Sequence, residues 1–134
     1  MTRFESAQFS ELLGKTLTKV ERVNSGERRE ELHFYTDDGF LFLQGHDQDC
    51  CESVGIEDIC GALEDLIGSP ILVAVAASQD DPNPADGIGM WTFYKLATVK
   101  GWVDIRWYGE SNGYYSVDVD TVKTRLVPDE RKAA

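Results

Sequence analysis

One aromatic-rich stretch, residues 91–119, constrains the fold of this chain more than any other part. It holds all three tryptophans and more than half of the aromatic side chains. Turn signals at residues 100–101 and 111–113 divide it into three segments rich in β-branched and aromatic residues. This pattern predicts an antiparallel meander of three strands.

The register of this meander predicts which side chains share a face. A two-residue turn at residues 100–101 would place Val99 opposite Trp102 and Phe93 opposite Tyr108. Directly opposed residues lie on one face, and sequence neighbours alternate. The apolar face, expected to face the core, would carry Tyr94, Leu96, Thr98, Val103, Ile105 and Trp107, with Val117 and Val119 added if Tyr115 lies opposite Trp107. The mixed face would carry Phe93, Lys95, Ala97, Trp102, Asp104, Arg106 and Tyr108, followed by Tyr114, Ser116 and Asp118.

The mixed face is the candidate ligand site. Flat aromatic rings with lysine and arginine between them suit a planar anionic ligand such as a nucleotide. The aromatics would stack on a base, Lys95 and Arg106 would hold phosphate oxygens, and Asp104 would accept a hydrogen bond from a ribose hydroxyl. The candidate ligand-binding residues are Phe93, Lys95, Trp102, Asp104, Arg106, Tyr108, Asn112 and Tyr114. The alternative is that a helix or a second subunit covers these aromatics.

The length and the cysteine content set the broad class. The 134 residues predict a single domain over residues 1–127 and a loose charged tail over residues 128–134. No apolar run is long enough for a membrane helix, and the N-terminus lacks the apolar core of a signal peptide, so a cytoplasmic protein is expected. The three cysteines, an odd number without an export signal, are expected to be reduced.

The formal net charge of -11 limits which partners the protein is expected to bind. A general nucleic-acid binder needs a basic surface to neutralise phosphates, so nucleic acid is not an expected partner. A membrane is not expected either, because no apolar run is long enough to span one. Three possibilities stay open: a small ligand gripped by a local cationic spot, a basic protein partner, and mimicry of nucleic-acid charge.

The rest of the chain predicts an α+β fold, with an antiparallel sheet of about six to seven strands and two helices. A short helix is expected at residues 6–14, where Ser6 could be the cap. A second helix is expected over residues 56–67, where Ile56, Ile59, Cys60, Leu63, Leu66 and Ile67 recur at helical spacing. Further strands are expected at residues 15–23, 30–36, 40–44, 71–77 and 121–127, and a long connection at residues 78–90.

No pattern in the chain indicates catalysis, a cofactor or a metal. His46, Asp47, Asp49, Cys50, Cys51 and Glu52 include every ligand type that a transition metal uses. Adjacent cysteines cannot easily both bind one tetrahedral ion, and no second ligand pair completes the set. With two histidines, both in the first half, no catalytic triad is recognisable. We therefore expect neither an enzyme nor a metal protein.

Three stretches carry a resemblance: His46-Asp-Gln-Asp-Cys-Cys-Glu-Ser53, Trp91-Thr-Phe-Tyr-Lys-Leu-Ala-Thr98 and Arg106-Trp-Tyr-Gly-Glu-Ser-Asn-Gly-Tyr-Tyr-Ser116. Together with Asp65-Leu-Ile-Gly-Ser-Pro70, they resemble a family of small phage and prophage proteins that carry a domain of uncharacterised function. The resemblance spans roughly residues 12–119.

In size, source and β-rich layout that family is similar to anti-Thoeris sponge proteins. Those proteins sequester cyclic ADP-ribose-type signals, and in some cases cyclic oligonucleotides, without cleaving them, and they assemble as dimers or hexamers. The resemblance therefore implies a homo-oligomeric counter-defence protein of the host cell cytoplasm. No ligand residue can be carried over from it. The alternative function is an acidic inhibitor that binds a host defence protein, with mimicry of nucleic-acid charge as one route to that binding.

Overall fold

The computed structural model describes residues 4–48, 50–85 and 87–126, and within them the chain forms strands and two short 3-10 helices. The elements in chain order are β1 (Glu5–Ser6), η1 (Phe9–Leu12), β2 (Leu17–Val23), β3 (Glu31–Thr36), β4 (Phe40–Gly45), β5 (Ser53–Cys60), η2 (Leu63–Leu66), β6 (Val73–Asp80), β7 (Ile88–Thr98), β8 (Gly101–Ser111) and β9 (Asp120–Arg125). The predicted tail at residues 128–134 lies outside the described residues.

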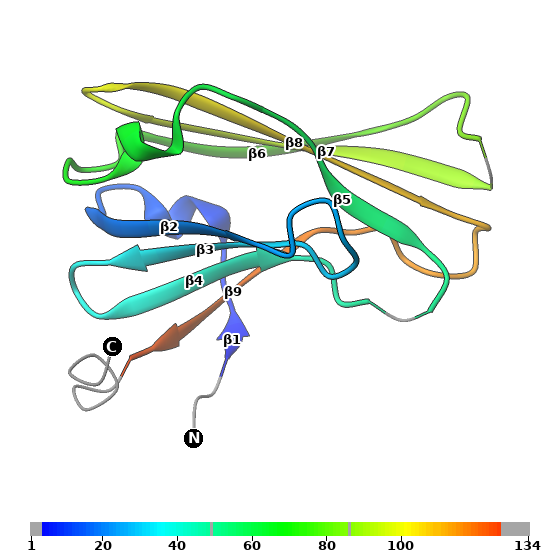
Figure 1. Ribbon diagram of the computed structural model, residues 1–134, viewed down its shortest axis with the longest axis horizontal. Coiled ribbons are helices and arrows are strands. Elements are labelled where there is room, and N and C mark those ends of the chain that lie inside the picture. The colour runs from blue at the N-terminus through cyan, green and yellow to red at the C-terminus, as the bar shows by residue number, and fades with distance from the viewer. Residues whose placement is uncertain (1–3, 49, 86, 127–134) are drawn as a thin grey trace.

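The strands form two antiparallel sheets that stack as layers (Figure 1). The five-stranded sheet has the order β1-β9-β4-β3-β2, and the four-stranded sheet has the order β5-β8-β7-β6. The α+β prediction is therefore wrong: the described part of the chain is all-β, and its only helical elements are η1 and η2, each of four residues.

The predicted second helix is a bulged strand followed by a 3-10 turn. In β5, Ile56 lies opposite Trp107 and Asp58 lies opposite Arg106, so Glu57 is an extra residue in the ladder. An extra residue changes the alternation of a strand locally. Ile56 and Ile59 consequently both pack against the core although they are three residues apart. This spacing is what imitates the period of a helix.

The predicted first helix is shorter than expected. The apolar stripe expected from Phe9, Leu12 and Leu13 is buried only in part: Phe9 and Leu12 of η1 are buried, whereas Leu13 is 56% exposed. Ser6 does not cap it, because Ser6 belongs to β1 and pairs with Val122 of β9. Gln8 occupies the capping position instead, and its backbone N–H donates to Glu11 Oε2 at 2.7 Å.

The aromatic hairpin forms as predicted, with a different register. Ala97, not Val99, lies opposite Trp102, and Trp91, not Phe93, lies opposite Tyr108. The register differs by two residues, and a shift by two leaves every side chain on its predicted face. The apolar face of β7 and β8 is buried: Tyr94, Leu96, Thr98, Val103, Ile105 and Trp107.

The third predicted strand of the meander is absent from the described residues. The neighbour of β8 is β5, and Ile56 rather than Tyr115 lies opposite Trp107. Residues 112–119 instead lead to β9, which pairs with β4 in the other sheet. The predicted connection at residues 78–90 is also shorter, because β6 extends to Asp80 and β7 begins at Ile88.

One hydrophobic core fills the space between the sheets. Leu32, Phe34 and Phe42 come from the five-stranded sheet, and Leu96 and Trp107 come from the four-stranded sheet. Among the described residues, no helix is long and apolar enough to cross a membrane. The opposite side of the four-stranded sheet faces solvent, and this side carries six of the eight predicted ligand residues.

Candidate functional site

The outer face is defined here as the side of the β5-β8-β7-β6 sheet that points away from the core. Directly opposed residues form rows across this face. The two central rows are Cys60, Asp104, Lys95 and Val75, and Asp58, Arg106, Phe93 and Ala77. The flanking rows hold Trp102, Ala97 and Val73 on one side, and Gly55, Tyr108, Trp91 and Gln79 on the other. The alternation along each strand thus brings six of the eight predicted residues to one surface.

A depression of about 510 Å³ occupies the two central rows. Four of the predicted residues line it: Phe93, Lys95, Asp104 and Arg106. Phe93 is half-buried and neighbours both cations on the face: Lys95 follows it two residues along β7, and Arg106 lies opposite it on β8. A flat ring next to two cations is an arrangement that can stack on a planar base and bind an attached phosphate.

The two cations of this depression are paired with carboxylates. Lys95 Nζ lies 3.8 Å from Asp104 Oδ1 and 5.5 Å from the centre of the Trp102 ring. Arg106 Nε donates to Glu57 Oε1 at 2.6 Å. All four charged side chains are about half exposed, so the pairs are worth little and can open.

Trp91 and Tyr108 form an aromatic pair at the next row. Their ring centres are 5.3 Å apart, and Trp91 Nε1 donates to Glu57 Oε1 at 3.2 Å. The Tyr108 hydroxyl donates to Asp81 Oδ2 at 2.6 Å and to Glu110 Oε2 at 3.1 Å. The hydrogen bond to Asp81 is the main reason why the pKa of Tyr108 is raised. Tyr108 is therefore tied to two carboxylates and does not line the depression.

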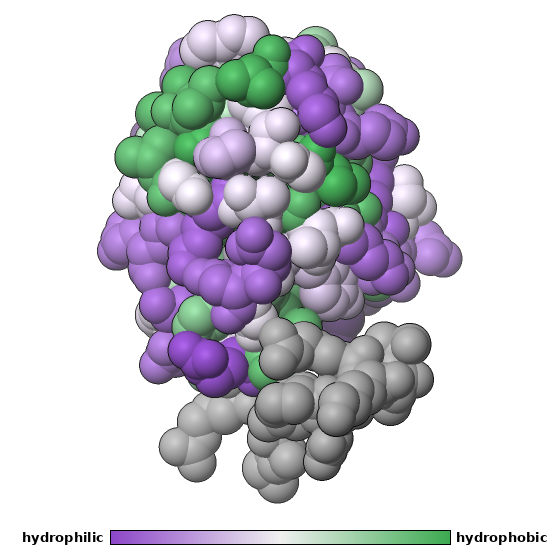
Figure 2. All heavy atoms as spheres, turned by 90° about the vertical axis from the view of Figure 1, so that its left-hand side faces the viewer, coloured by the Kyte–Doolittle hydropathy of each residue, from purple (hydrophilic) through white to green (hydrophobic). Residues whose placement is uncertain are grey.

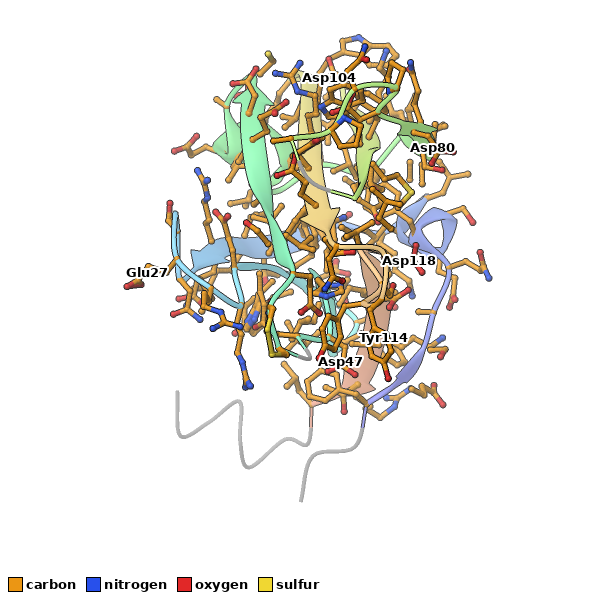
Figure 3. All side chains as sticks on the ribbon, turned by 90° about the vertical axis from the view of Figure 1, so that its right-hand side faces the viewer. Glu27, Asp47, Asp80, Asp104, Tyr114 and Asp118 are labelled. Atoms are coloured by element: carbon orange, nitrogen blue, oxygen red, sulfur yellow. A yellow bond between two sulfur atoms is a disulfide. The ribbon has the colours of Figure 1, made fainter. Side chains whose placement is uncertain are left out.

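The last two predicted residues lie elsewhere. Asn112 accepts a hydrogen bond from the Tyr114 backbone N–H at 2.9 Å within the turn after β8, and the Tyr114 side chain is 83% exposed. Figure 3 shows Asp104 at the top of the view and Tyr114 well below it. The structure therefore does not bring Asn112 and Tyr114 into the outer-face depression.

Several residues of the depression were missed by the sequence reasoning. Asp58, Cys60, Val75 and Ala77 line it from β5 and β6. Residues 56–67 were expected to be helical, so β5 was not expected beside β8. The Asp58 carboxylate accepts a hydrogen bond from Cys60 Sγ at 3.2 Å and raises the pKa of the Cys60 thiol. A thiol with a raised pKa stays protonated near neutral pH, which makes it a weak nucleophile.

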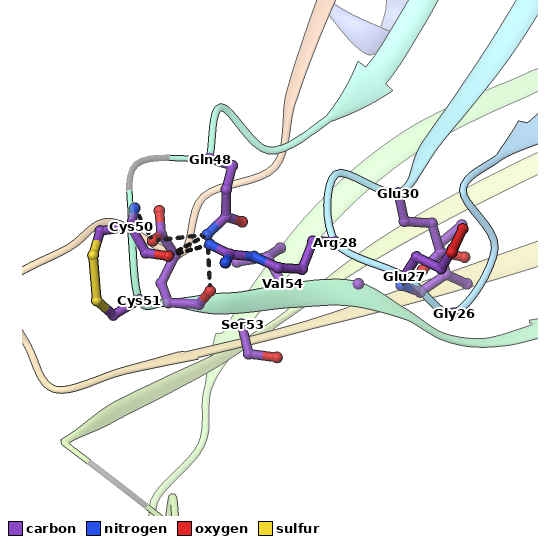
Figure 4. Close-up of a pocket in the computed structure, with 12 residues that line it drawn as sticks. Gly26, Glu27, Arg28, Glu30, Gln48, Cys50, Cys51, Ser53 and Val54 are labelled. Atoms are coloured by element: carbon purple, nitrogen blue, oxygen red, sulfur yellow. Dashed lines mark hydrogen bonds between the residues drawn. A yellow bond between two sulfur atoms is a disulfide. The ribbon is translucent and has the colours of Figure 1, made fainter.

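A second depression, of about 480 Å³, lies between the loop before β3 and the start of β5 (Figure 4). Its polar groups are bound to one another. Arg28 donates to the Cys50 carbonyl oxygen, and Glu30 accepts from Arg22 at 2.6 Å and from the Ile56 N–H at 2.8 Å. These contacts tie the loop to β5 and favour a structural role over a ligand site.

The Cys–Cys segment beside this depression differs from the expectation of reduced thiols. Cys50 and Cys51 are joined by a disulfide, and Cys60 is free and exposed. Nearby, Glu52 is buried and accepts from Gln48 Nε2 at 3.1 Å and from the Cys50 N–H at 2.9 Å. These contacts fix the backbone of the segment ahead of β5.

His46 belongs to the same buried network. Its Nε2 lies 2.7 Å from Glu52 Oε2, and its Nδ1 lies 2.6 Å from the Asp118 carbonyl oxygen. Through its two ring nitrogens, His46 therefore links Glu52, which lies ahead of β5, to Asp118, which lies ahead of β9. No group of three or more potential metal ligands occurs within residues 4–48, 50–85 and 87–126. Asp49, one of the residues considered for a metal, lies outside these ranges.

The fold and the site define a class: a two-sheet all-β protein with an exposed sheet face that carries aromatic and paired cationic side chains. Residues 10–121 match a domain of unknown function, DUF7448, and the chain belongs to this family. This match agrees with the expected relation to a domain of uncharacterised function. No curated protein and no solved structure matches the chain significantly.

Proposed function

We propose that the outer face binds a small planar anionic ligand of the nucleotide type and that the protein holds this ligand without changing it chemically. The observation that carries the proposal is the position of Phe93 next to both Lys95 and Arg106 in an open depression of about 510 Å³. A volume of a few hundred cubic ångströms is typical of small-molecule sites.

Binding would require an exchange of charge partners. Arg106 is paired with Glu57, so a phosphate oxygen would replace that carboxylate at the guanidinium group. Asp104, released from Lys95 in the same way, could accept from a ribose hydroxyl. Asp58 and Asp104 balance the two cations among the lining residues, which favours a ligand with few negative charges.

The biological role that we propose for this binding is sequestration of the ligand. We propose a cyclic ADP-ribose-type signal or a cyclic oligonucleotide as the ligand, held by a homo-oligomer in the host cell cytoplasm as a phage counter-defence. The support is the resemblance of the three motif stretches to small phage proteins. A sponge needs tight binding and no chemistry, which agrees with the protonated Cys60 thiol beside the depression.

A calorimetric titration tests the proposal directly. The protein would be titrated with cyclic ADP-ribose isomers and with cyclic di- and trinucleotides, and each complex would then be heated and the released ligand analysed. Saturable heat with intact ligand recovered is the expected result. A hydrolysed product would make the protein an enzyme, and no heat with any ligand would refute nucleotide binding.

One observation favours a second function, an acidic inhibitor that binds a basic host protein. Asp80, Asp81 and Asp118 line a depression of about 690 Å³ together with Ile88 and the exposed Tyr114, and its described lining residues include no lysine or arginine. Acidic groups around an apolar and aromatic centre suit a basic partner.

The test of this second function uses charge-neutral variants. Asp80→Asn combined with Asp118→Asn should abolish salt-sensitive binding of the basic host partner. Glu27→Gln is the matched control, because Glu27 is also exposed and lies on the other side of the molecule in Figure 3. Equal binding by both variants would contradict the inhibitor function.

A further inference from the structure

The outer edges of the two sheets differ in how they are protected. An edge strand presents unpaired N–H and C=O groups, and bulges, charges or short length usually prevent pairing with another chain. β5 has a bulge next to Asp58, and β2 has a register shift between Leu17 and Lys19 as well as several charged residues. β1 is only two residues long.

β6 has none of these devices, although η1 packs beside it. It pairs with β7 in unbroken register over eight residues, and its first charged residue is the last one, Asp80. Residues 75–80 are all exposed. Ile71, just before β6, already has a backbone hydrogen-bond partner, because the Gly14 N–H donates to its carbonyl oxygen at 2.8 Å. Within residues 4–48, 50–85 and 87–126, no strand pairs with the outer side of β6.

We propose that this edge pairs with β6 of a second copy of the chain, in antiparallel orientation about a two-fold axis. The two four-stranded sheets would then form one continuous sheet of eight strands. The choice of a second copy of the chain as the partner rests on charge. A chain with a formal net charge of -11 can associate with itself only where carboxylates do not face each other, and the β6 edge meets this condition.

The pairing partners across the axis are favourable. With the axis at Ala76, Val75 faces Ala77 of the other copy, and Asp80 faces Leu72. Leu72 and Val75 are 54% and 55% exposed in the single chain, and the pairing would cover part of both. Figure 2 shows hydrophobic side chains gathered in the upper part of the end that carries η2 and the β7–β8 turn.

The pairing also places the partner beside the ligand site. Val75 and Ala77 of β6 line the outer-face depression, so the partner strand would continue its wall on that side. This consequence rests on the proposed function, whereas the pairing itself does not.

Size-exclusion chromatography with light scattering tests the pairing. The wild type should be a dimer and Ala76→Glu a monomer, because Ala76 is exposed on β6 and does not line the depression. A mixture of Ala76→Glu and Ala76→Lys should restore the dimer through opposite charges. Thr18→Glu, which adds the same charge to the exposed edge of β2, is the control and should stay dimeric. Circular dichroism would verify that every variant is folded.

Three results would overturn the inference: a wild type that is monomeric at its highest soluble concentration, a dimer that survives Ala76→Glu, or a dimer that Thr18→Glu disrupts equally. Calorimetric titration of the same samples separates this inference from the proposed function. A dimer that binds no nucleotide refutes nucleotide binding and leaves the pairing standing. A monomeric wild type that binds nucleotide refutes the pairing and the homo-oligomer and leaves the nucleotide site standing.

Discussion

Trp107 of β8 donates its indole N–H to Gln44 Oε1 of β4 at 2.7 Å, and both side chains are completely buried. This hydrogen bond is a polar link between the two sheets beside the hydrophobic core cluster. Gln44 Nε2, on the same amide, has no hydrogen-bond partner among the described residues. The indole is therefore the group that compensates part of the cost of burying this amide.

The first prediction concerns this pair. Trp107→Phe should lower the free energy of unfolding by roughly 1–3 kcal/mol for the unpaired Gln44 oxygen, with a further loss for the cavity. Gln44→Leu alone should leave the indole N–H unpaired at a similar cost. The double variant should be more stable than the sum of the two losses predicts, because neither polar group is then left alone. Urea unfolding of the four proteins measures this coupling, and strictly additive losses would contradict the link.

The second prediction concerns acid. Hydrogen bonding from Lys123, at 2.5 Å, lowers the pKa of Glu11, and hydrogen bonding from Lys15, at 2.5 Å, lowers the pKa of Asp38. A carboxyl group with a lowered folded-state pKa stabilises the fold above its unfolded pKa. That contribution is lost as the pH falls through the folded-state pKa. We therefore expect the free energy of unfolding to decrease below the ordinary range of carboxyl pKa values.

Urea unfolding at a series of acidic pH values measures this decrease. Lys123→Gln should give a shallower decrease, because Glu11 loses the partner that holds its pKa down. Lys19→Gln removes an exposed lysine from β2 and serves as the control. Identical pH profiles for wild type and Lys123→Gln would rule out this contribution.

The third prediction concerns Gly109. A Cβ atom at this position would lie 2.7 Å from Val117 Cβ and 2.9 Å from the Val117 carbonyl oxygen. Gly109→Ala should therefore destabilise the protein by roughly 1–3 kcal/mol, as overpacking of a core does. Gly45→Ala is the matched strand control, because the nearest atom there is in the flexible Glu31 side chain at 3.2 Å. Equal thermal stability of the two variants would show that residues 112–119 do not cross β8 at this point.

The face of the aromatic hairpin could be predicted although its register could not. Alternation decides the face, and the predicted and observed registers differ by two residues, so Trp107 and Phe93 keep their sides. The exact register depends on the turn, where Thr98 rather than Val99 is the last paired residue of β7. A register error of one residue would have reversed every assignment.

The errors in fold class have a common physical cause. Local spacing cannot distinguish a bulged strand from a helix when the bulge places Ile56 and Ile59 on one face. The edge beside β8 was consequently assigned to residues 114–119, whereas β5 occupies it. Pairing of β5 with β8 joins residues far apart in the chain, and no local pattern encodes it.

The candidate site was predicted only in part, because alternation within one hairpin can be read from the sequence and the pairing of that hairpin with β5 cannot. Phe93, Lys95, Asp104 and Arg106 come from one hairpin, so alternation alone brought them together. Tyr114 was included through a third strand that is absent from the described residues, and Asn112 through the turn expected to lead into that strand. Glu57, the partner of Arg106, was missed because it sits at the bulge of β5.

The most direct test of nucleotide binding compares Arg106→Ala with Glu57→Gln by calorimetry, using cyclic ADP-ribose isomers and cyclic di- and trinucleotides. Both side chains are about half exposed, and glutamine keeps an oxygen acceptor for the Trp91 N–H, so both variants should fold. We expect Arg106→Ala to abolish binding. Glu57→Gln should tighten binding a few-fold, because an exposed ion pair worth about 0.2–1 kcal/mol no longer competes with the phosphate. Wild-type affinity in Arg106→Ala, or weaker binding in Glu57→Gln, would contradict a nucleotide site on the outer face.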